Sequence, residues 1–171
     1  MKAGCRMGTI CLLALALVGL SAQAQKLGAS DGVLNRTQAS KSMPATVFFR
    51  GQISSTQERN SCGIRLPNGR MVLAALVDTS GYASEVRANY QGYLLTEIPL
   101  NFEGHTILPG AYGFGFVANH QFVMLNLGGE KLWTAPTHSF HGRHAVPLEM
   151  LAAAGGYELC SGLECVGLHH P

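Results

Sequence analysis

From residue 45 onward, apolar residues recur in short runs that turn-forming residues interrupt at intervals of about ten. Runs of this length, bounded by Gly, Asn, Pro and Ser, are typical of strands in antiparallel sheets. The pattern therefore predicts an all-β, mostly antiparallel domain over residues 45–171. We expect a β-sandwich or a barrel-like single domain.

The strongest local turn signal is the dipeptide Asn68-Gly69. Both residue types tolerate the positive φ angles of a two-residue type I′ hairpin turn. Such a turn predicts three apolar cross-strand pairs on one face, namely Leu66 with Met71, Ile64 with Leu73, and Cys62 with Ala75. Residues 71–77 are apolar on both faces, which predicts a buried strand. A helix is the alternative, because Leu and Ala favour helices.

An aromatic strand is predicted over residues 112–118. Alternation places three rings on one face, those of Tyr112, Phe114 and Phe116. Gly113 and Gly115 fall on the other face, where a bare backbone lets a neighbouring segment approach closely. The apolar run at residues 122–127 is expected to pair with this strand.

The last third of the chain carries weaker signals. Residues 147–154 have Pro near the start and Gly past the end, which favours a short helix, with a strand as the alternative. Residues 157–166 are expected to close the domain as a hairpin. Residues 136–145 are polar and rich in His, which is typical of an exposed loop.

The first 24 residues have the order of a secretory signal peptide. Lys2 and Arg6 precede an apolar stretch over residues 9–20, and Ala22 and Ala24 form an A-x-A pattern that predicts cleavage before Gln25. The stretch is shorter than the ~20 residues that span a bilayer, so no membrane anchor is expected after processing. We therefore expect a secreted or periplasmic protein. Residues 25–44 are poor in large apolar side chains and are expected to form a flexible tail.

The net charge of the chain argues against one class of partner, nucleic acids. The chain has 12 Lys and Arg against 10 Asp and Glu, and Lys2 and Arg6 leave with the predicted leader. The mature chain is then formally neutral, and a neutral chain lacks the basic footprint expected for nucleic-acid binding.

Three cysteines remain in the predicted mature chain. Cys160 and Cys165 flank four residues that suit a turn, and opposed strand positions of this kind meet the separation that a disulfide requires. We therefore predict the pair Cys160–Cys165. Cys62 is left over, either as a buried small residue or as a link between molecules, which would allow self-association. Pairing of Cys62 with either of the other two is the alternative.

One segment carries a resemblance. Residues 104–112, GHTILPGAY, resemble the G-x-x-L-P-A-G-x-Y segment of small exported bacterial β-sandwich proteins of unknown function. Gly104, Gly110 and Tyr112 match in spacing, while Pro109 occupies the usual Ala position. The wider stretch of residues 72–132 is similar to uncharacterised secreted bacterial proteins with a leader and a compact β domain. The resemblance implies export and a β-sandwich, and it brings no activity and no catalytic residues.

The sharpest candidate for a binding site is the spacing His138-x-x-His141-x-x-His144. Three imidazoles on one loop can converge on zinc or copper. The spacing is not a known metal signature, and the nearby Pro and Gly residues argue against a helix that would align the rings. A solvated polar loop is the favoured interpretation, so no metal or other cofactor is expected.

The sequence gives weak support for a hydrolytic active site. Asp31 and Asp78 are the available Asp residues for a serine triad, and Asp78 with the following Thr, Ser and Gly is better explained as a turn. A glycosidase needs two carboxylates in one cleft, for which Glu85, Glu97 and Glu103 are candidates. Glu97 interrupts an apolar strand, and alternation favours an outward position for it.

Aromatic side chains offer a second kind of binding surface. Exposed rings on a sheet can stack against carbohydrate, and the candidates are Trp133, Tyr82, Tyr90 and Tyr93. Rings in β domains are more often part of the core.

Taken together, the sequence favours an exported, non-enzymatic β-sandwich module that serves as an accessory or interaction domain. A metal-binding protein using His138, His141 and His144 is the alternative, and a secreted hydrolase comes third.

Overall fold

The computed structural model of the chain describes Met1 and residues 32–140 and 145–170. The predicted signal peptide over residues 1–24 lies outside this part of the chain, except for Met1. The described part of the chain folds into two antiparallel sheets that are not closed into a barrel, together with two short helices. The predicted all-β, sandwich-like class is therefore confirmed.

The larger sheet follows the order β1-β3-β4-β5-β8-β9-β10, with β2 also paired to β3. Its strands are β1 (Gly32–Val33), β2 (Thr46–Phe49), β3 (Gln52–Arg65), β4 (Met71–Val77), β5 (Gly92–Thr96), β8 (Gly110–Val117), β9 (Gln121–Leu125) and β10 (Lys131–Pro136). The smaller sheet follows the order β12-β13-β14-β6-β7, with β11 also paired to β14. Its strands are β6 (Leu100–Phe102), β7 (His105–Ile107), β11 (His138–Ser139), β12 (Val146–Ala153), β13 (Gly156–Gly162) and β14 (Glu164–His169).

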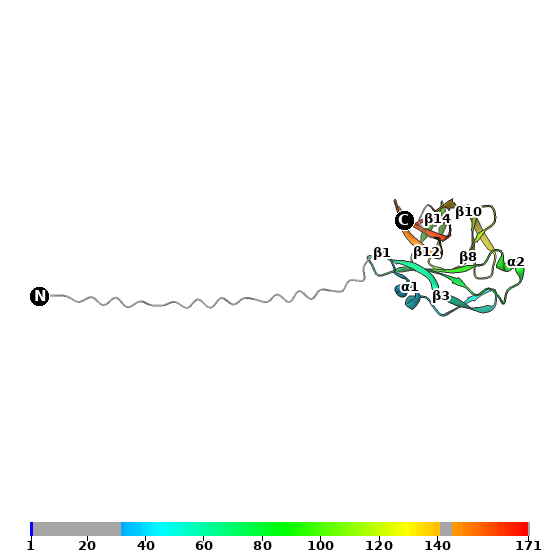
Figure 1. Cartoon of the computed structure of the whole chain (residues 1–171), viewed down its shortest axis with the longest axis horizontal. Coiled ribbons are helices and arrows are strands. Elements are labelled where there is room, and N and C mark those ends of the chain that lie inside the picture. Colours follow the sequence, from blue (N-terminus) through cyan, green and yellow to red (C-terminus); the bar gives the residue numbers. More distant parts are fainter. Residues whose placement is uncertain (2–31, 141–144, 171) are drawn as a thin grey trace.

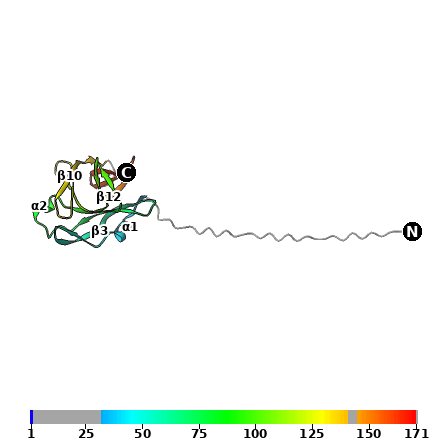
Figure 2. The same ribbon diagram turned by 180° about the vertical axis from the view of Figure 1, so that it is seen from behind.

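The larger sheet is covered on both faces, which makes it the middle layer. The smaller sheet lies on one side of it, and α1 (Arg36–Ser42) lies on the other, as the two opposite views in Figures 1 and 2 show. Alternation along β4 explains the two cores, because Val72 and Ala74 face the smaller sheet while Leu73 and Ala75 face α1 and β2. The apolar run of β4 is thus buried on both faces, as the sequence predicts.

The hairpin between β3 and β4 has a different register from the predicted one. Ile64 pairs with Val72, one position away from the predicted partner Leu73. The backbone N–H of Gly69 donates to the Leu66 carbonyl at 2.8 Å, and Gly69 alone among the turn residues has a positive φ. Pro67 explains the change, because its fixed φ suits the second position of a type I turn, which adds one residue to the loop.

Residues 32–44 also differ from the flexible tail predicted over residues 25–44, of which residues 25–31 lie outside the described part of the chain. From Gly32 onward the chain forms β1 and then α1, which buries Ala39. Asn35 and Gln38 close the helix start with a reciprocal capping box, in which each side chain accepts the other residue's backbone N–H. The Asn-x-x-Gln spacing was the available sequence signal for this helix.

The sequence favours a helix over residues 147–154, but β12 (Val146–Ala153) takes up almost all of this segment, so that prediction is wrong. β12 pairs with β13 along most of its length and lies at the edge of the smaller sheet. An edge strand tolerates Pro147, which lacks a backbone donor, and eight residues make a marginal helix. By contrast, β8 matches the prediction, because Tyr112, Phe114 and Phe116 pack in the core between the sheets.

Candidate functional site

Two separate clefts in the described part of the chain gather polar side chains. The first, which we call the Arg50 cleft, has a volume of about 410 Å³. Its walls carry polar groups from the β2–β3 turn, α2 (Ser84–Arg87) and the start of β10, and its floor is aromatic. The residues that matter for its chemistry are Arg50, Gln52, Tyr82, Glu85, Asn89 and Lys131.

Backbone geometry positions Arg50 at the rim of this cleft. Phe49 pairs with Gln52, and the two residues between them, Arg50 and Gly51, both have positive φ. This combination defines a type I′ turn, in which Asn, Asp or Gly is the usual choice and Arg is uncommon. The Arg50 N–H donates to the Leu127 carbonyl at 2.9 Å, so the turn is tied to the loop before β10.

The Arg50 side chain lies against a bare backbone. A Cβ atom added at Gly129 would meet Arg50 Cγ at 2.6 Å, closer than real Cβ contacts allow. The aliphatic part of the Arg50 side chain thus packs in the space that the missing Gly129 side chain leaves. Both this packing and the turn therefore orient the Arg50 side chain.

The floor of the Arg50 cleft is fixed by hydrogen bonds and ring packing. The Tyr82 hydroxyl donates to the Phe49 carbonyl at 3.0 Å and accepts from the Ser54 hydroxyl at 2.9 Å. The Phe49 ring stacks on Tyr90 with centroids 3.7 Å apart. Burial, the largest cause, raises the pKa of Tyr90, so this ring stays uncharged at any ordinary pH.

The charges of the Arg50 cleft are not neutralised by ion pairs. Arg50, Glu85 and Lys131 are exposed, and the ion pairs among the described residues join only His to Glu. Two cations and one carboxylate therefore line the cleft. Their charges are available to a ligand.

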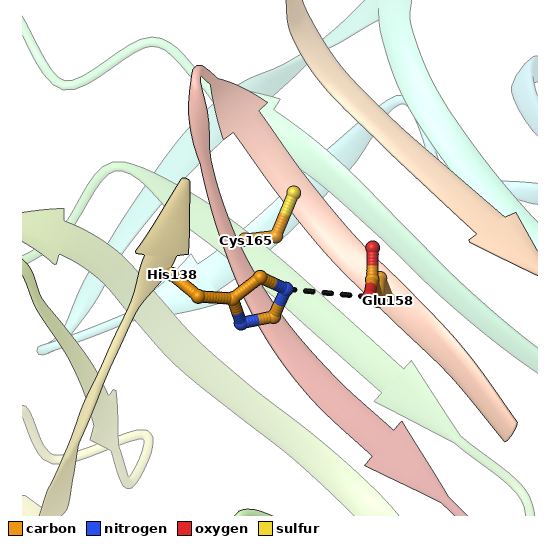
Figure 3. Close-up of side chains that lie close together, drawn as sticks. All are labelled: His138, Glu158 and Cys165. Carbon is orange, nitrogen blue, oxygen red and sulfur yellow. Dashed lines mark ion pairs between the residues drawn. The ribbon is translucent and has the colours of Figure 1, made fainter. Parts of the chain in front are cut away.

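The second cleft lies on the outer face of the smaller sheet, and we call it the His138 cleft. It has a volume of about 320 Å³ and is lined by Glu103, His138, Tyr157, Glu158 and His169, among others. Nε2 of His138 lies 3.2 Å from Oε1 of Glu158. Figure 3 shows the imidazole reaching from β11 across β14 toward this carboxylate on β13.

Sulfur lies beside this pair. Three residues, His138, Glu158 and Cys165, each offer one potential ligand atom, and these three atoms lie within 4.8 Å of one another. Cys165 forms the predicted disulfide with Cys160, at the cross-strand pair where β13 meets β14. In this state, His138 and Glu158 are the donors of this group that remain for a metal. The other two members of the predicted loop site, His141 and His144, lie outside the described residues.

The three carboxylates considered for glycoside hydrolysis are not brought together. Glu85 lines the Arg50 cleft and Glu103 lines the His138 cleft, while Glu97 lines a third hollow. Glu97 is exposed and accepts the Met71 N–H at 2.7 Å. The Glu103 carboxylate accepts the Gly167 N–H at 3.0 Å and shares its cleft with Glu158, a neighbour that its sequence position does not suggest.

Asp78 forms the predicted turn. Its carboxylate accepts the Ser80 N–H at 2.9 Å, and this hydrogen bond, with a smaller contribution from the Ser80 side chain, lowers the pKa of Asp78. Asp31, the other Asp, lies outside the described residues.

The aromatic candidates belong to the core. Tyr82, Tyr90 and Tyr93 are buried. Trp133 is half-buried against the core between the sheets, and His105 stacks on it with centroids 4.8 Å apart and an angle of 6°. These four rings therefore do not form an open stacking platform.

Cys62 is a free, buried thiol, which is the first of its two predicted alternatives. Burial, the largest cause, and the nearby Glu149 carboxylate raise the pKa of this thiol. It is therefore protonated and unreactive in the folded domain. Self-association through Cys62 stays a prediction.

Arg50 and Lys131 were not singled out in the sequence. The signal that could have found the first is the dipeptide Arg50-Gly51 between two apolar-polar alternating segments, which suits a tight hairpin. Lys131 had no comparable signal, because its place in the cleft depends on how β9 and β10 pair with the rest of the sheet.

Comparisons with known proteins assign no role to either cleft. No family model matches the chain, and neither a curated protein nor a solved structure matches it. The resemblance of residues 104–112 to exported bacterial proteins stays a prediction. Within the described residues, neither helix has the length and apolar character needed to cross a membrane.

Proposed function

We propose that this protein is an exported, non-enzymatic binding module that holds a small anionic ligand in the Arg50 cleft. The observation that carries the proposal is the pairing of two unneutralised cations, Arg50 and Lys131, over a rigid aromatic floor. A guanidinium binds a carboxylate or a phosphate with two parallel hydrogen bonds, which gives orientation as well as affinity.

The dimensions of the cleft agree with this role. Its volume of about 410 Å³ falls in the range of roughly 300–1,000 Å³ that small-molecule sites occupy. Ala83 and Val86, which are not buried, supply apolar surface, while Gln52 and Asn89 supply hydrogen-bonding groups at the walls. A ligand with a short apolar body and one or two acidic groups would use all of these features.

The conformation of Arg50 gives further support. A non-glycine residue with positive φ is disfavoured by steric crowding, at a cost on the order of 1 kcal/mol. Asn or Gly at this position would form the same turn without that cost. Arg50 therefore keeps a disfavoured backbone conformation at a turn position from which it lines the cleft.

The proposal is tested by calorimetric titration of the mature chain with inorganic phosphate, citrate and an acidic dipeptide. We expect at least one probe to bind, and the double variant Arg50→Gln, Lys131→Gln to weaken its binding by roughly tenfold or more. The matched control, Lys41→Gln with Arg59→Gln, removes two exposed cations outside the cleft and should leave affinity unchanged. Absence of binding by all three probes, or equal affinity in both double variants, would refute the assignment.

Export and lack of turnover are separate parts of the proposal. Expression of the full chain in a bacterium with a secretory pathway should release a protein whose first residue is Gln25. An intact precursor in the cytosol would contradict export. Screening the mature chain against broad hydrolase substrates should give no turnover. Turnover that disappears on a single side-chain substitution would contradict the non-enzymatic role.

A second candidate function is metal binding by His138, His141 and His144. The observation that favours it is the position of the His138 imidazole, half exposed and beside the Glu158 carboxylate in an open cleft. Titration with zinc or copper, with the triple His→Ala variant as the comparison, tests it. Unchanged affinity in the triple variant would remove this candidate.

A further inference from the structure

We propose that reduction of the Cys160–Cys165 disulfide creates a zinc site on the outer face of the smaller sheet. Its four ligands are the two cysteine thiolates, the imidazole of His138 and the carboxylate of Glu158. This site is distinct from the three-histidine loop set, with which it shares only His138.

Strand register places the four groups on one face. Cys160 of β13 is directly opposite Cys165 of β14, and Cys165 is directly opposite His138 of β11. Glu158 precedes Cys160 by two positions on β13, so its side chain emerges on the same face of the sheet. The face turned away from these residues carries Leu159 and Val166 in the core.

The distances suit one small ion. The ligand atoms of His138, Glu158 and Cys165 lie within 4.8 Å of one another, and the Cys160 sulfur is bonded to that of Cys165. Zinc with bonds of about 2.0–2.3 Å holds its tetrahedral ligand atoms roughly 3.3–3.8 Å apart. On this proposal, rotations about the side-chain bonds of His138 and Glu158, which line a cleft, and of the two reduced cysteines bring the ligand atoms to that spacing.

Reduction controls this site because thiolates, not disulfide sulfurs, bind zinc. A dithiol reductant transfers two electrons and two protons to the Cys160–Cys165 bond, giving two thiols while the dithiol becomes a disulfide. Zinc then binds the two sulfurs and displaces both thiol protons to solvent. With two thiolates and one carboxylate the complete site has three negative charges against the two positive charges of the ion.

The structure also provides the route to the sulfurs. Both cysteines are buried, and the neighbouring His138 side chain is 47% exposed. On this proposal, a rotation of the His138 side chain gives a small dithiol access to the bond. β14 remains paired with β13, β6 and β11 without the disulfide, so the sheet that carries the ligands has other support.

The test compares zinc binding by oxidised and reduced mature chain, the latter reduced with a small dithiol and desalted without oxygen. We expect the reduced chain to bind one zinc ion at least roughly 100-fold more tightly than the oxidised chain. The reduced chain with cobalt in place of zinc should show thiolate-to-cobalt charge-transfer absorption. Equal affinity in the two redox states, or no thiolate band, would overturn the proposal.

Variants identify the ligands. His138→Ala and Glu158→Gln should each weaken zinc binding by the reduced chain about tenfold or more. His120→Ala is the matched control, because His120 also pairs with a carboxylate, Glu164 at 2.9 Å, and should have no effect. Cys62→Ala should likewise have no effect. Unchanged affinity in the first two variants, or its loss in Cys62→Ala, would refute this ligand set.

Two further outcomes are informative. If the double variant His141→Ala, His144→Ala abolishes binding, the loop set holds the ion and the present site is wrong. If the reduced chain loses its β circular-dichroism spectrum, zinc should restore that spectrum in the parent and not in His138→Ala. Failure of zinc to restore the spectrum would also overturn the proposal.

Discussion

Replacing Gly115 with Ala tests how closely the segment after α2 packs on the larger sheet. A Cβ atom at this position would meet the Asn89 carbonyl group, with the carbonyl carbon at 2.9 Å and the oxygen closer still. Ordinary contacts of Cβ atoms begin at 3.4 Å. The obstacle is main chain, so no side-chain rotation relieves the overlap.

The Asn89 segment is also held in place. The Gln91 N–H donates to the Phe114 carbonyl at 2.8 Å, and the Gln91 side chain makes two hydrogen bonds of 2.9 Å with the backbone of Phe116. Overpacking costs about 1–3 kcal/mol. Weakening one such hydrogen bond adds about 1 kcal/mol. A gain of about 0.4–1 kcal/mol from the stiffer unfolded chain offsets part of this.

We therefore expect Gly115→Ala to lower the free energy of unfolding by roughly 1–3.5 kcal/mol, and the melting temperature by about 2–14 °C. Urea unfolding followed by the fluorescence of the single tryptophan, Trp133, measures the change. Gly110→Ala in the same strand is the control, since its Cβ would lie 3.5 Å from the nearest ring atom. Equal urea midpoints for the two variants would refute the packing argument.

Three further predictions concern stability and thiol reactivity. Replacing Cys160 and Cys165 with Ala should lower the free energy of unfolding by about 2 kcal/mol, because the disulfide closes a short loop; an unchanged urea midpoint would contradict this. Cys62 should not react with thiol reagents in the native protein and should react fully in urea; prompt native labelling, detected by mass spectrometry, would contradict its burial. The lowered pKa of Asp78 stabilises the fold at pH values above about 4, and that contribution is lost as pH falls through the folded-state pKa. Asp78→Asn should therefore reduce the acid dependence of the melting temperature, and an identical pH profile would argue against this.

Local alternation predicted much of the fold because it depends on neighbouring residues alone. The rings of β8, the two-sided apolar run of β4 and the cross-strand position of Cys160 and Cys165 all follow from a period of two and a turn. The β3–β4 register did not follow, because Pro67 changed the turn type and shifted every pair by one position.

The two clefts depend on long-range pairing and could not be predicted from local patterns. The Arg50 cleft combines the β2–β3 turn, α2 and the start of β10, which are far apart in the chain. Likewise, β11 of two residues has no recognisable strand pattern, yet its pairing with β14 is what brings His138 beside Cys165 and Glu158.

The most direct test of the proposed binding role is a titration followed by amide NMR chemical shifts. The isotope-labelled mature chain is titrated with the anion that binds best. If the Arg50 cleft holds the anion, the shift changes will concentrate at Arg50, Glu85, Asn89 and Lys131 and will disappear in the Arg50→Gln, Lys131→Gln variant. Shift changes that cluster elsewhere, or that persist in this variant, would contradict the proposed role.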